Sequence, residues 1–324
     1  MYWFSRKKKE TPPINGLILP GGGARNAYQA GVLKALAEML PADALNPFPV
    51  ISGTSSGALN AAILASNATQ FGEGIARMIG IWENFHCGKI FHVDSWTALK
   101  SGLRWTSSFA TAGLGRAAPP ALLDNTPQRE FIESHIRLAR IQHAIDTGAL
   151  RALAVTSSSY SSGLSFNYYQ AIDGLRPWQR TRRLGVAEEI TIDHLMASSA
   201  IPLVFPAVWL DDEYHGDGSM RESAPLSPAI HLGADRLLII GVRNPAPDPK
   251  PAAGEKVPYP TIGQITGYML DTLFMDRLDS DIERMNRVNH IIGETRSKYI
   301  EPEDTTLRPI EILMISRSKD VREI

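Results

Sequence analysis

The residues Phe48-Pro49-Val50-Ile51-Ser52-Gly53-Thr54-Ser55-Ser56-Gly57 lead directly into an apolar run at residues 58–65. A strand-length apolar stretch, a glycine-bounded turn and a helix-forming run therefore follow one another. The same order occurs earlier, where residues 14–19 precede Gly21-Gly22-Gly23 and a helical apolar spacing over residues 28–40. Two such units predict a parallel sheet whose strands are connected by crossover helices.

The rest of the chain continues this alternation without an internal repeat or a shift in composition. We predict further strands at residues 152–156, 164–169, 209–214, 237–242 and 310–315, and helices at residues 126–140, 192–199 and 261–292. The simplest organisation is a single α/β domain with a mainly parallel central sheet over residues 14–324. A flexible basic tail at residues 1–13 precedes it.

Composition excludes several classes of protein. Of the 324 residues, 44% are hydrophobic and 21% are charged, which is typical of a folded chain with a sizeable core. Lys plus Arg number 33 against 34 Asp plus Glu, which argues against a dedicated nucleic-acid binder. The single cysteine, Cys87, excludes an intramolecular disulfide, and no apolar run is long enough to span a bilayer. We therefore expect a cytoplasmic protein that is at most peripheral to a membrane.

The N-terminal tail has two interpretations. Trp3 and Phe4 precede Arg6-Lys7-Lys8-Lys9, which is the reverse of the order in a secretory signal. We favour a solvated, frayed end. The alternative is an aromatic and basic foot that rests on an anionic membrane surface.

Two further segments leave alternatives open. Residues 88–120 combine Trp96, Trp105 and Phe109 with Ser, Thr and Gly in no regular period, which predicts either a lid over a binding site or a surface excursion packed by its own aromatic side chains. The long amphipathic helix at residues 261–292 carries apolar residues on one side. That side either packs on the domain or forms a dimer or membrane contact.

Ser55 is the strongest candidate for a nucleophile. It occupies the centre of a G-x-S-x-G pattern between a predicted strand and a predicted helix. Gly53 and Gly57 matter because side chains at these positions would crowd a strand that turns directly into a helix. The turn pushes the serine out at the helix N-terminus, where the helix dipole favours negative charge on its oxygen. A helix N-cap with no catalytic role is the alternative.

The segment Gly21-Gly22-Gly23-Ala24-Arg25 can present consecutive backbone N–H groups to an anion. One use is a phosphate site, which would indicate a nucleotide- or phosphate-binding α/β enzyme. The segment lacks the lysine of a P-loop, however, and Asn26 breaks the dinucleotide-binding pattern. The other use is an oxyanion hole, in which each donor contributes roughly 2.7–4 kcal/mol to catalysis. The neighbouring serine turn favours the oxyanion hole.

A serine nucleophile needs a base, and the chain offers eight histidines and one distinctive aspartate. Each histidine is more simply explained as a surface or core residue. His231 and His290 come late enough for an α/β-hydrolase order, but both lie in helix-like surroundings. Asp217 is bracketed by Gly216 and Gly218, which let the backbone approach closely and turn sharply. An ordinary turn aspartate is the alternative.

Together these motifs resemble the patatin-like phospholipase family. The resemblance covers about residues 16–242 and implies a three-layer α/β/α fold, a Ser–Asp dyad and hydrolysis of acyl esters in lipids, without metal or cofactor. It rests on four segments in order, namely Gly21-Gly22-Gly23-Ala24-Arg25, Gly53-Thr54-Ser55-Ser56-Gly57, Ala197-Ser198-Ser199-Ala200-Ile201-Pro202-Leu203-Val204-Phe205-Pro206 and Asp217-Gly218-Ser219.

Carried over by position, the resemblance makes Ser55 the nucleophile and Asp217 the base. It assigns the oxyanion donors to Gly21, Gly22 and Gly23, and supporting roles to Arg25, Gly53, Gly57 and Gly218.

The chain departs from the family pattern at three positions. Asn26 stands where a glycine is frequent, although Asn tolerates the left-handed backbone conformation. Ser219 replaces the second glycine of D-G-G, and Pro20 precedes the glycines where a polar residue is common. These departures concern the detail of the loops more than the dyad.

The resemblance predicts a serine esterase of the phospholipase A type that acts on lipid at a membrane or micelle surface. It implies no nucleic-acid partner, and a homodimer is an open alternative. The alternative is a catalytically silent lipid-binding or scaffold member of the same fold. Because the dyad contains no histidine, log(kcat/KM) should lack an acid limb that an imidazole with a pKa of ~6.5 would cause. No motif indicates the lipid headgroup, acyl position or chain length.

Overall fold

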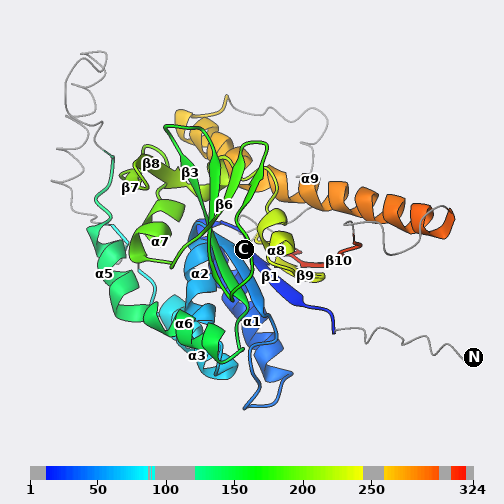
Figure 1. The fold of residues 1–324 in the computed structure, drawn as a ribbon. Helices are drawn as coiled ribbons and strands as arrows, with labels where there is room; N and C mark the ends of the chain where they lie inside the picture. Colours follow the sequence, from blue (N-terminus) through cyan, green and yellow to red (C-terminus); the bar gives the residue numbers. More distant parts are fainter. Residues whose placement is uncertain are drawn as a thin grey trace, which may run out of the picture.

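The computed structural model describes residues 12–86, 88, 90–91, 121–243, 259–298 and 308–318, and within them a ten-stranded sheet forms the centre of the molecule (Figure 1). The strands are β1 (Asn15–Leu19), β2 (Val50–Thr54), β3 (Ala152–Ser159), β4 (Ser165–Ala171), β5 (Trp178–Arg180), β6 (Arg183–Ala187), β7 (Val208–Leu210), β8 (Glu213–Asp217), β9 (Arg236–Ile240) and β10 (Glu311–Ile315). Their order is β10-β9-β1-β2-β3-β4-β6-β5, and β8 pairs with both β3 and β7.

The strands that carry the site motifs are parallel. β10, β9, β1, β2 and β3 pair side by side in one direction, whereas β4 runs antiparallel to β3. The prediction of a mainly parallel central sheet is therefore confirmed. Because parallel strands end at the same edge, the segments after β1 and β2 lie next to one another.

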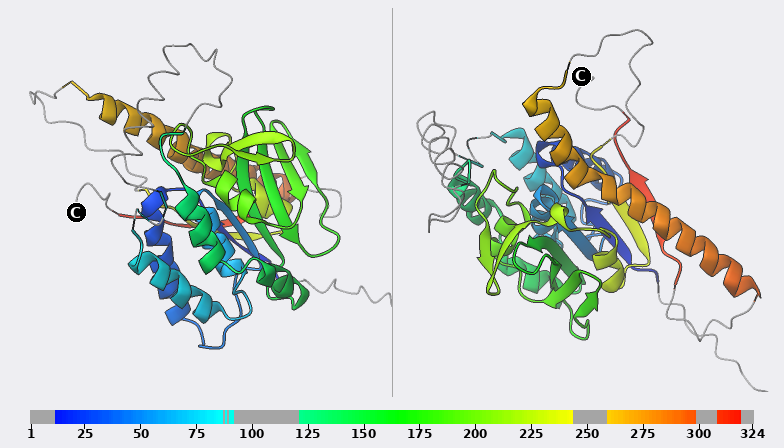
Figure 2. Two further views of the ribbon diagram at one scale, coloured as in Figure 1. Left: turned by 90° about the vertical axis from the view of Figure 1, so that its left-hand side faces the viewer. Right: turned by 90° about the horizontal axis from the view of Figure 1, so that it is seen from above.

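Helices cover both faces of the sheet, so the predicted three-layer α/β/α architecture is also confirmed. In Figure 2 (right), the blue and cyan helices and the orange helix α9 lie on opposite sides of the sheet. The helices are α1 (Ala27–Glu38), α2 (Ser56–Ala65), α3 (Phe71–Glu83), α5 (Thr126–His135), α6 (Ala139–Asp146), α7 (Ile192–Ser198), α8 (Ser227–His231) and α9 (Ile262–Lys298), with short 3-10 turns η1 (Gly23–Asn26) and η3 (Gly218–Met220).

The alternation of side chains along the strands divides the core into two clusters. Leu17 and Leu19 of β1 pack with α2 and α3 in one cluster, whereas Ile18 faces the other cluster with α8 and α9. On that second face, α9 contributes Leu278 and Ile282 to the core. The orange C-terminal end of α9 projects beyond the sheet (Figure 1).

Strand β3 brings two distant parts of the chain together. Along one side of β3, β2 pairs as far as Thr54, which faces Thr156. β4 occupies the other side over the full length of the pairing. β8 then continues on the side of β2, with Asp217 facing Ser157. Thr54 and Asp217 therefore face consecutive residues of β3.

Two predicted elements are wrong. Residues 209–214 are not one strand: β7 and β8 form a hairpin that turns at Asp211 and Asp212, whose φ angles are 47° and 61°. The two adjacent acidic residues tolerate this left-handed turn. Residues 126–140 form two helices, α5 and α6, because Ile136 adopts an extended conformation.

Several predictions fall on residues outside the described ranges. They include the tail except residues 12–13, the greater part of the predicted lid (residues 92–120) and Cys87. Within the described ranges, no helix combines the length and apolar composition needed to cross a membrane.

Candidate active site

Ser55 occupies a strained turn between β2 and α2. Its φ and ψ are 55° and −132°, in a region that costs a non-glycine residue about 1–3 kcal/mol. Two hydrogen bonds hold the turn: the Ser55 amide donates to Ser198 Oγ at 2.9 Å, and the Ala58 amide donates to the Ser55 carbonyl at 2.9 Å. Strain of this kind places a side chain where an unconstrained chain would not.

The glycines of the predicted G-x-S-x-G motif make this turn possible. A Cβ on Gly53 would lie 2.6 Å from the Gly57 carbonyl oxygen, and a Cβ on Gly57 would lie 2.0 Å from the carbonyl oxygen of Leu19. Backbone atoms cannot yield at such distances. Both positions therefore require glycine, which agrees with the supporting role that the sequence predicts for them.

Asp217 ends β8 with its side chain completely buried. Its amide donates to the Ala200 carbonyl at 2.9 Å, and its Oδ1 accepts from the Ser219 amide at 2.9 Å. A Cβ on Gly218 would lie 2.2 Å from the Thr156 carbonyl oxygen, so Gly218 must be glycine for η3 to pack on β3. Three backbone contacts thus fix the carboxylate.

Ser55 and Asp217 interact directly although they are far apart in the sequence. Burial raises the pKa of Asp217 to about 6, and hydrogen bonding by the side chains of Ser55 and Ser219 and by the Ser219 amide opposes this rise. Asp217 Oδ2 is buried, and because of its burial the carboxyl has a pKa closer to neutrality than that of an exposed aspartate.

The glycine loop lies against the same two residues. A Cβ on Gly21 would lie 2.9 Å from both Ser55 Cβ and Ser219 Oγ, and a Cβ on Gly22 would lie 2.5 Å from Val242 Cγ2. Gly23 has a φ of 59°, which favours glycine. The structure therefore places the predicted oxyanion loop beside the serine, and Arg25 lies half-buried in η1 behind it.

Two of the three departures from the family pattern, Asn26 and Pro20, are in contact with each other. Asn26 is fully buried in η1, and its Nδ2 donates to the Pro20 carbonyl at 3.0 Å. Gln29 Nε2 donates to the same carbonyl at 3.0 Å. Asn26 has a φ of −70°, so the left-handed tolerance that the sequence suggested for it is not used. Its contribution is instead the hydrogen bond that anchors the loop.

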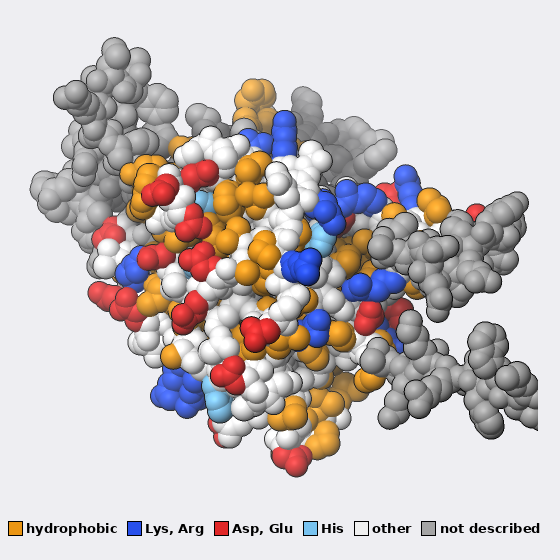
Figure 3. Space-filling model, viewed as in Figure 1, with side chains coloured by type: hydrophobic (Ala, Val, Ile, Leu, Met, Phe, Trp, Pro, Cys, Tyr) orange, Lys and Arg blue, Asp and Glu red, His pale blue; other side chains and the backbone are white. Residues whose placement is uncertain are grey.

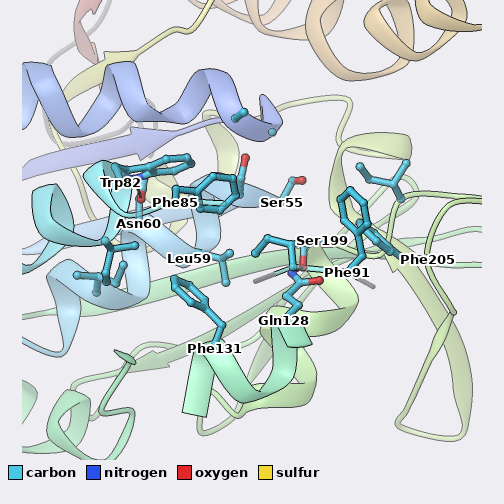
Figure 4. Close-up of a pocket in the computed structure, with 17 residues that line it drawn as sticks. Ser55, Leu59, Asn60, Trp82, Phe85, Phe91, Gln128, Phe131, Ser199 and Phe205 are labelled. Atoms are coloured by element: carbon cyan, nitrogen blue, oxygen red, sulfur yellow. Dashed lines mark hydrogen bonds between the residues drawn. The ribbon is translucent and has the colours of Figure 1, made fainter. Parts of the chain in front are cut away.

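An apolar cavity of about 230 Å³ opens beside Ser55. In Figure 4, Trp82 and Asn60 lie at one end of the cavity and Phe91 and Phe205 at the other, with Ser55 between them. Its walls come from the glycine loop, α2, the end of α3, α5 and the segment after α7, and consist of Gly23, Ala24, Ser55, Ser56, Leu59, Asn60, Ile63, Ile81, Trp82, Phe85, Ile90, Phe91, Gln128, Phe131, Ser199, Ile201 and Phe205.

Four polar side chains in the cavity wall form two pairs, whereas Ser56 Oγ is buried without a hydrogen-bond partner in the described structure. Trp82 Nε1 donates to Asn60 Oδ1 at 3.0 Å, and Gln128 Nε2 donates to Ser199 Oγ at 2.6 Å. These pairs leave the cavity suited to an apolar ligand. The sequence did not indicate Asn60, Trp82 or Gln128, because they come from three helices with ordinary patterns.

Glu222 is a second buried acid near the site that sequence reasoning missed. Its Oε1 accepts hydrogen bonds from Thr54 Oγ1 at 2.8 Å and Thr156 Oγ1 at 3.2 Å. Burial raises its pKa to about 7. Through Thr54, which immediately precedes Ser55, Glu222 ties the serine turn to β3. Its position five residues after Asp217 was the only available signal.

No described histidine lines the cavity. The nearest in sequence to the aspartate is His215, and its Nδ1 lies 3.0 Å from Ser157 Oγ. Burial lowers the pKa of His215, so this ring stays neutral in the core. Across the described ranges there is also no cluster of three or more His, Cys, Asp or Glu side chains suited to a metal ion.

A curated relative matches a short part of the chain. Over 53 residues, the chain is 51% identical to the lysophospholipase nte1 of Aspergillus terreus, which corresponds to 16% of this chain and 3% of that protein.

Two solved structures resemble the chain weakly. VipD from Legionella pneumophila covers 94% of this chain at 13% identity and a TM-score of 0.42, and the type III effector protein ExoU covers 71% at 18% identity and 0.34. The match spans 61% and 43% of those two chains. The protein-family model for patatin-like phospholipases matches residues 17–230 of the chain. This chain therefore belongs to the patatin-like phospholipase family.

Proposed function

We propose that the protein is a lipid acyl hydrolase in which Ser55 is the nucleophile and Asp217 is the general base. The observation that carries this proposal is the interaction of a strained serine with a buried carboxylate at the wall of an apolar cavity. The family membership supports the same chemistry. Hydrolysis of a carboxylic ester is the reaction that these groups suit best.

The reaction has two steps. The Asp217 carboxylate accepts the proton of Ser55 Oγ while this oxygen forms a bond to the ester carbonyl carbon. The carbonyl oxygen becomes negatively charged beside the amides of Gly21, Gly22 and Gly23, which we assign as its donors. When the ester C–O bond breaks, the leaving alcohol takes the proton. Water then gives a proton to Asp217 while its oxygen forms a bond to the acyl carbon. When the bond between this carbon and Ser55 Oγ breaks, Oγ takes the proton from Asp217, which releases the fatty acid and restores Ser55 and the Asp217 carboxylate.

The cavity supports an apolar acyl group as the part of the substrate that is bound. Leu59 and Phe131 line the arm on the side of Ser55 toward Trp82 (Figure 4), and Ile63 and Ile81 also line the cavity. Ile63 is 1% exposed and Ile81 is 9% exposed, and we infer that they close the far end of this arm. An acyl chain would fill it, and the alcohol portion of the lipid would extend toward Phe91 and Phe205.

Labelling with a fluorophosphonate tests the proposed nucleophile. The wild-type protein should be labelled at Ser55, and Ser55→Ala should not be labelled. Ser66→Ala is the matched control, because Ser66 is a buried serine at the other end of α2 and does not line the cavity.

Ester hydrolysis by the Asp217→Asn variant tests the base. Loss of a general base lowers kcat by about 10²–10⁴-fold, and activity near that of the wild type would disprove the dyad. A wild-type protein that binds lipid but neither reacts with the probe nor hydrolyses esters would instead be the silent lipid-binding member of the family.

A further inference from the structure

Five large side chains are exposed on one side of the molecule, next to the open end of the cavity. We call this set the rim patch; it consists of Leu122, Tyr160, Leu203, Trp209 and Tyr214, whose exposed fractions are 39%, 46%, 65%, 55% and 50%. Large apolar side chains gathered on a surface mark an interaction site.

Contacts join the members of the rim patch in two groups, Leu122 with Leu203, and Tyr160 and Trp209 with Tyr214. The Leu122 amide donates to the Leu203 carbonyl at 2.9 Å, and the Tyr160 amide donates to the Tyr214 carbonyl at 2.8 Å. The Trp209 and Tyr214 rings form a T-shaped pair with centroids 4.8 Å apart. Leu203 and Trp209 lie on the same short segment that follows α7.

The backbone of Leu203 has a conformation that is unfavourable for a residue with a side chain. Its φ is 67°, in the left-handed region that costs a non-glycine residue roughly 1–2 kcal/mol. Its neighbours Ile201 and Phe205 both line the cavity, whereas Leu203 points an apolar side chain into solvent. Backbone strain that exposes a leucine beside a binding cavity indicates a functional contact.

The charges beside the rim patch restrict its partner. Asp211, Asp212 and Glu213 lie in sequence between Trp209 and Tyr214, at the turn and the start of β8, and Figure 3 shows acidic side chains beside the hydrophobic ones over β7 and β8. Three carboxylates repel an anionic membrane surface. Trp and Tyr, by contrast, are the side chains that favour the headgroup level of a bilayer.

We propose that the rim patch docks on an electrically neutral, zwitterionic lipid surface and so brings the open end of the cavity to the lipid. This inference rests on the proposed function, which makes a lipid ester the substrate. It differs from the hypothesis for the N-terminal tail, which requires an anionic surface.

Vesicle binding tests the proposal separately from catalysis. Flotation of the Ser55→Ala chain with phosphatidylcholine vesicles measures docking without hydrolysis, so a failed nucleophile assignment does not affect the result. We expect the Ser55→Ala chain, whose rim patch is unchanged, to bind phosphatidylcholine vesicles and to bind less when the vesicles also contain phosphatidylglycerol. Salt should reduce this difference, because it screens the carboxylates.

Substitutions in the rim patch make the test specific. Leu203→Ala and Trp209→Ala, each in the Ser55→Ala chain, should lower the partition coefficient about tenfold. The matched control is Leu45→Ala, because Leu45 is 62% exposed and lies before β2, at the opposite end of that strand from Ser55. Circular dichroism melting curves verify that each variant is folded.

Three results of the binding experiments would overturn the proposal. The first is that both rim variants partition like the wild type. The second is that Leu45→Ala lowers the partition coefficient as much as they do, and the third is that vesicles with phosphatidylglycerol are bound more tightly. A dimer in sedimentation velocity that Leu203→Ala converts to a monomer would also overturn it, because the rim patch would then bind a second copy of the chain.

Discussion

Gly57 and Leu19 approach each other so closely that the first turn of α2 is packed directly on the end of β1. A Cβ on Gly57 would lie 2.0 Å from the Leu19 carbonyl oxygen and 2.6 Å from that of Pro20. This contact joins the serine turn to the start of the glycine loop. The close packing of Gly57 thus helps to hold the nucleophile next to the proposed oxyanion donors.

Replacing Gly57 by alanine should destabilise the protein. The new methyl group meets backbone atoms, so the helix must shift, at a cost of about 1–3 kcal/mol or more. Urea unfolding monitored by fluorescence measures the change. In the control, Gly31→Ala, nothing lies within 4 Å of the new Cβ on the exposed side of α1. That variant should be more stable by roughly 0.5–1 kcal/mol. An equal change in the free energy of unfolding in the two variants would contradict the close packing of Gly57.

The activity should fall at acidic pH because the base must be ionised. Burial raises the pKa of Asp217 to about 6, so log(kcat/KM) should fall with unit slope below about pH 6. This limb lies close to where an imidazole would also produce one, so the profile has to be combined with the Asp217→Asn variant to distinguish the two groups. A profile that stays flat down to pH 4.5 would refute the assignment of Asp217 as the base.

The same buried carboxylate should make the protein less stable at neutral pH. Its pKa in the folded state is about 6, above the unfolded value of ~3.9, so stability is lost as pH rises between these values. Asp217→Asn should therefore be more stable than the wild type above pH 6, by up to about 3 kcal/mol. The difference should vanish below pH 4. Urea unfolding at pH 7 and below pH 4 measures this difference in stability. A variant that is less stable than the wild type at pH 7 would contradict the predicted direction of the change.

Ser198 should matter for turnover although it does not reach the cavity. Its hydroxyl is the acceptor for the Ser55 amide, so Ser198→Ala leaves a buried N–H unpaired in a strained turn, which costs about 1–3 kcal/mol. We expect kcat to fall about 10- to 100-fold with little change in KM. Ser165→Ala is the control, because Ser165 Oγ is buried without a hydrogen bond in the described structure. Equal kinetics for the two variants would exclude a positioning role.

The closed arm of the cavity should limit the length of the acyl chain. Ile63 follows Ser55 by eight positions along α2, which corresponds to about 12 Å of helix. An extended chain of about ten carbons has this length, since its bonds are near 1.5 Å. With soluble esters, kcat/KM should rise about fourfold per methylene up to that length and then level off.

Ile63→Ala should move this limit to longer chains. Ile141→Ala provides the control, because Ile141 is equally buried but lies in α6, away from the cavity. A limit that moves in both variants, or in neither, would show that Ile63 does not close the arm.

Local sequence patterns were sufficient to predict the main elements of the sheet and the segments around Ser55 and Asp217. Strand-length apolar runs and glycines at crowded turns reflect interactions within a few residues, as at Gly53 and Gly57. The hairpin at Asp211 and Asp212 was missed, because residues 208–214 contain no glycine, proline or asparagine that would mark a turn. The break between α5 and α6 was missed for a similar reason, since the apolar spacing does not stop at Ile136.

The cavity and the pairing of buried acids were beyond prediction from the sequence. Ile63, Trp82 and Phe131 belong to three helices whose patterns only show that each helix has a buried side. Whether those sides enclose a space depends on how the helices pack. Glu222 likewise gives no signal of its own, because its partners Thr54 and Thr156 are placed beside it by strand pairing.

Strand β3 sets the relative position of the two reacting groups, because the strands that carry them, β2 and β8, both pair with it. Because each group is registered on β3 by its own strand, the connections between them can lengthen or shorten during evolution without changing their separation. Loss of a single residue from β8 would be far more damaging. It would slide the carboxylate by one strand step of about 3.4 Å and turn it to the opposite face of the sheet.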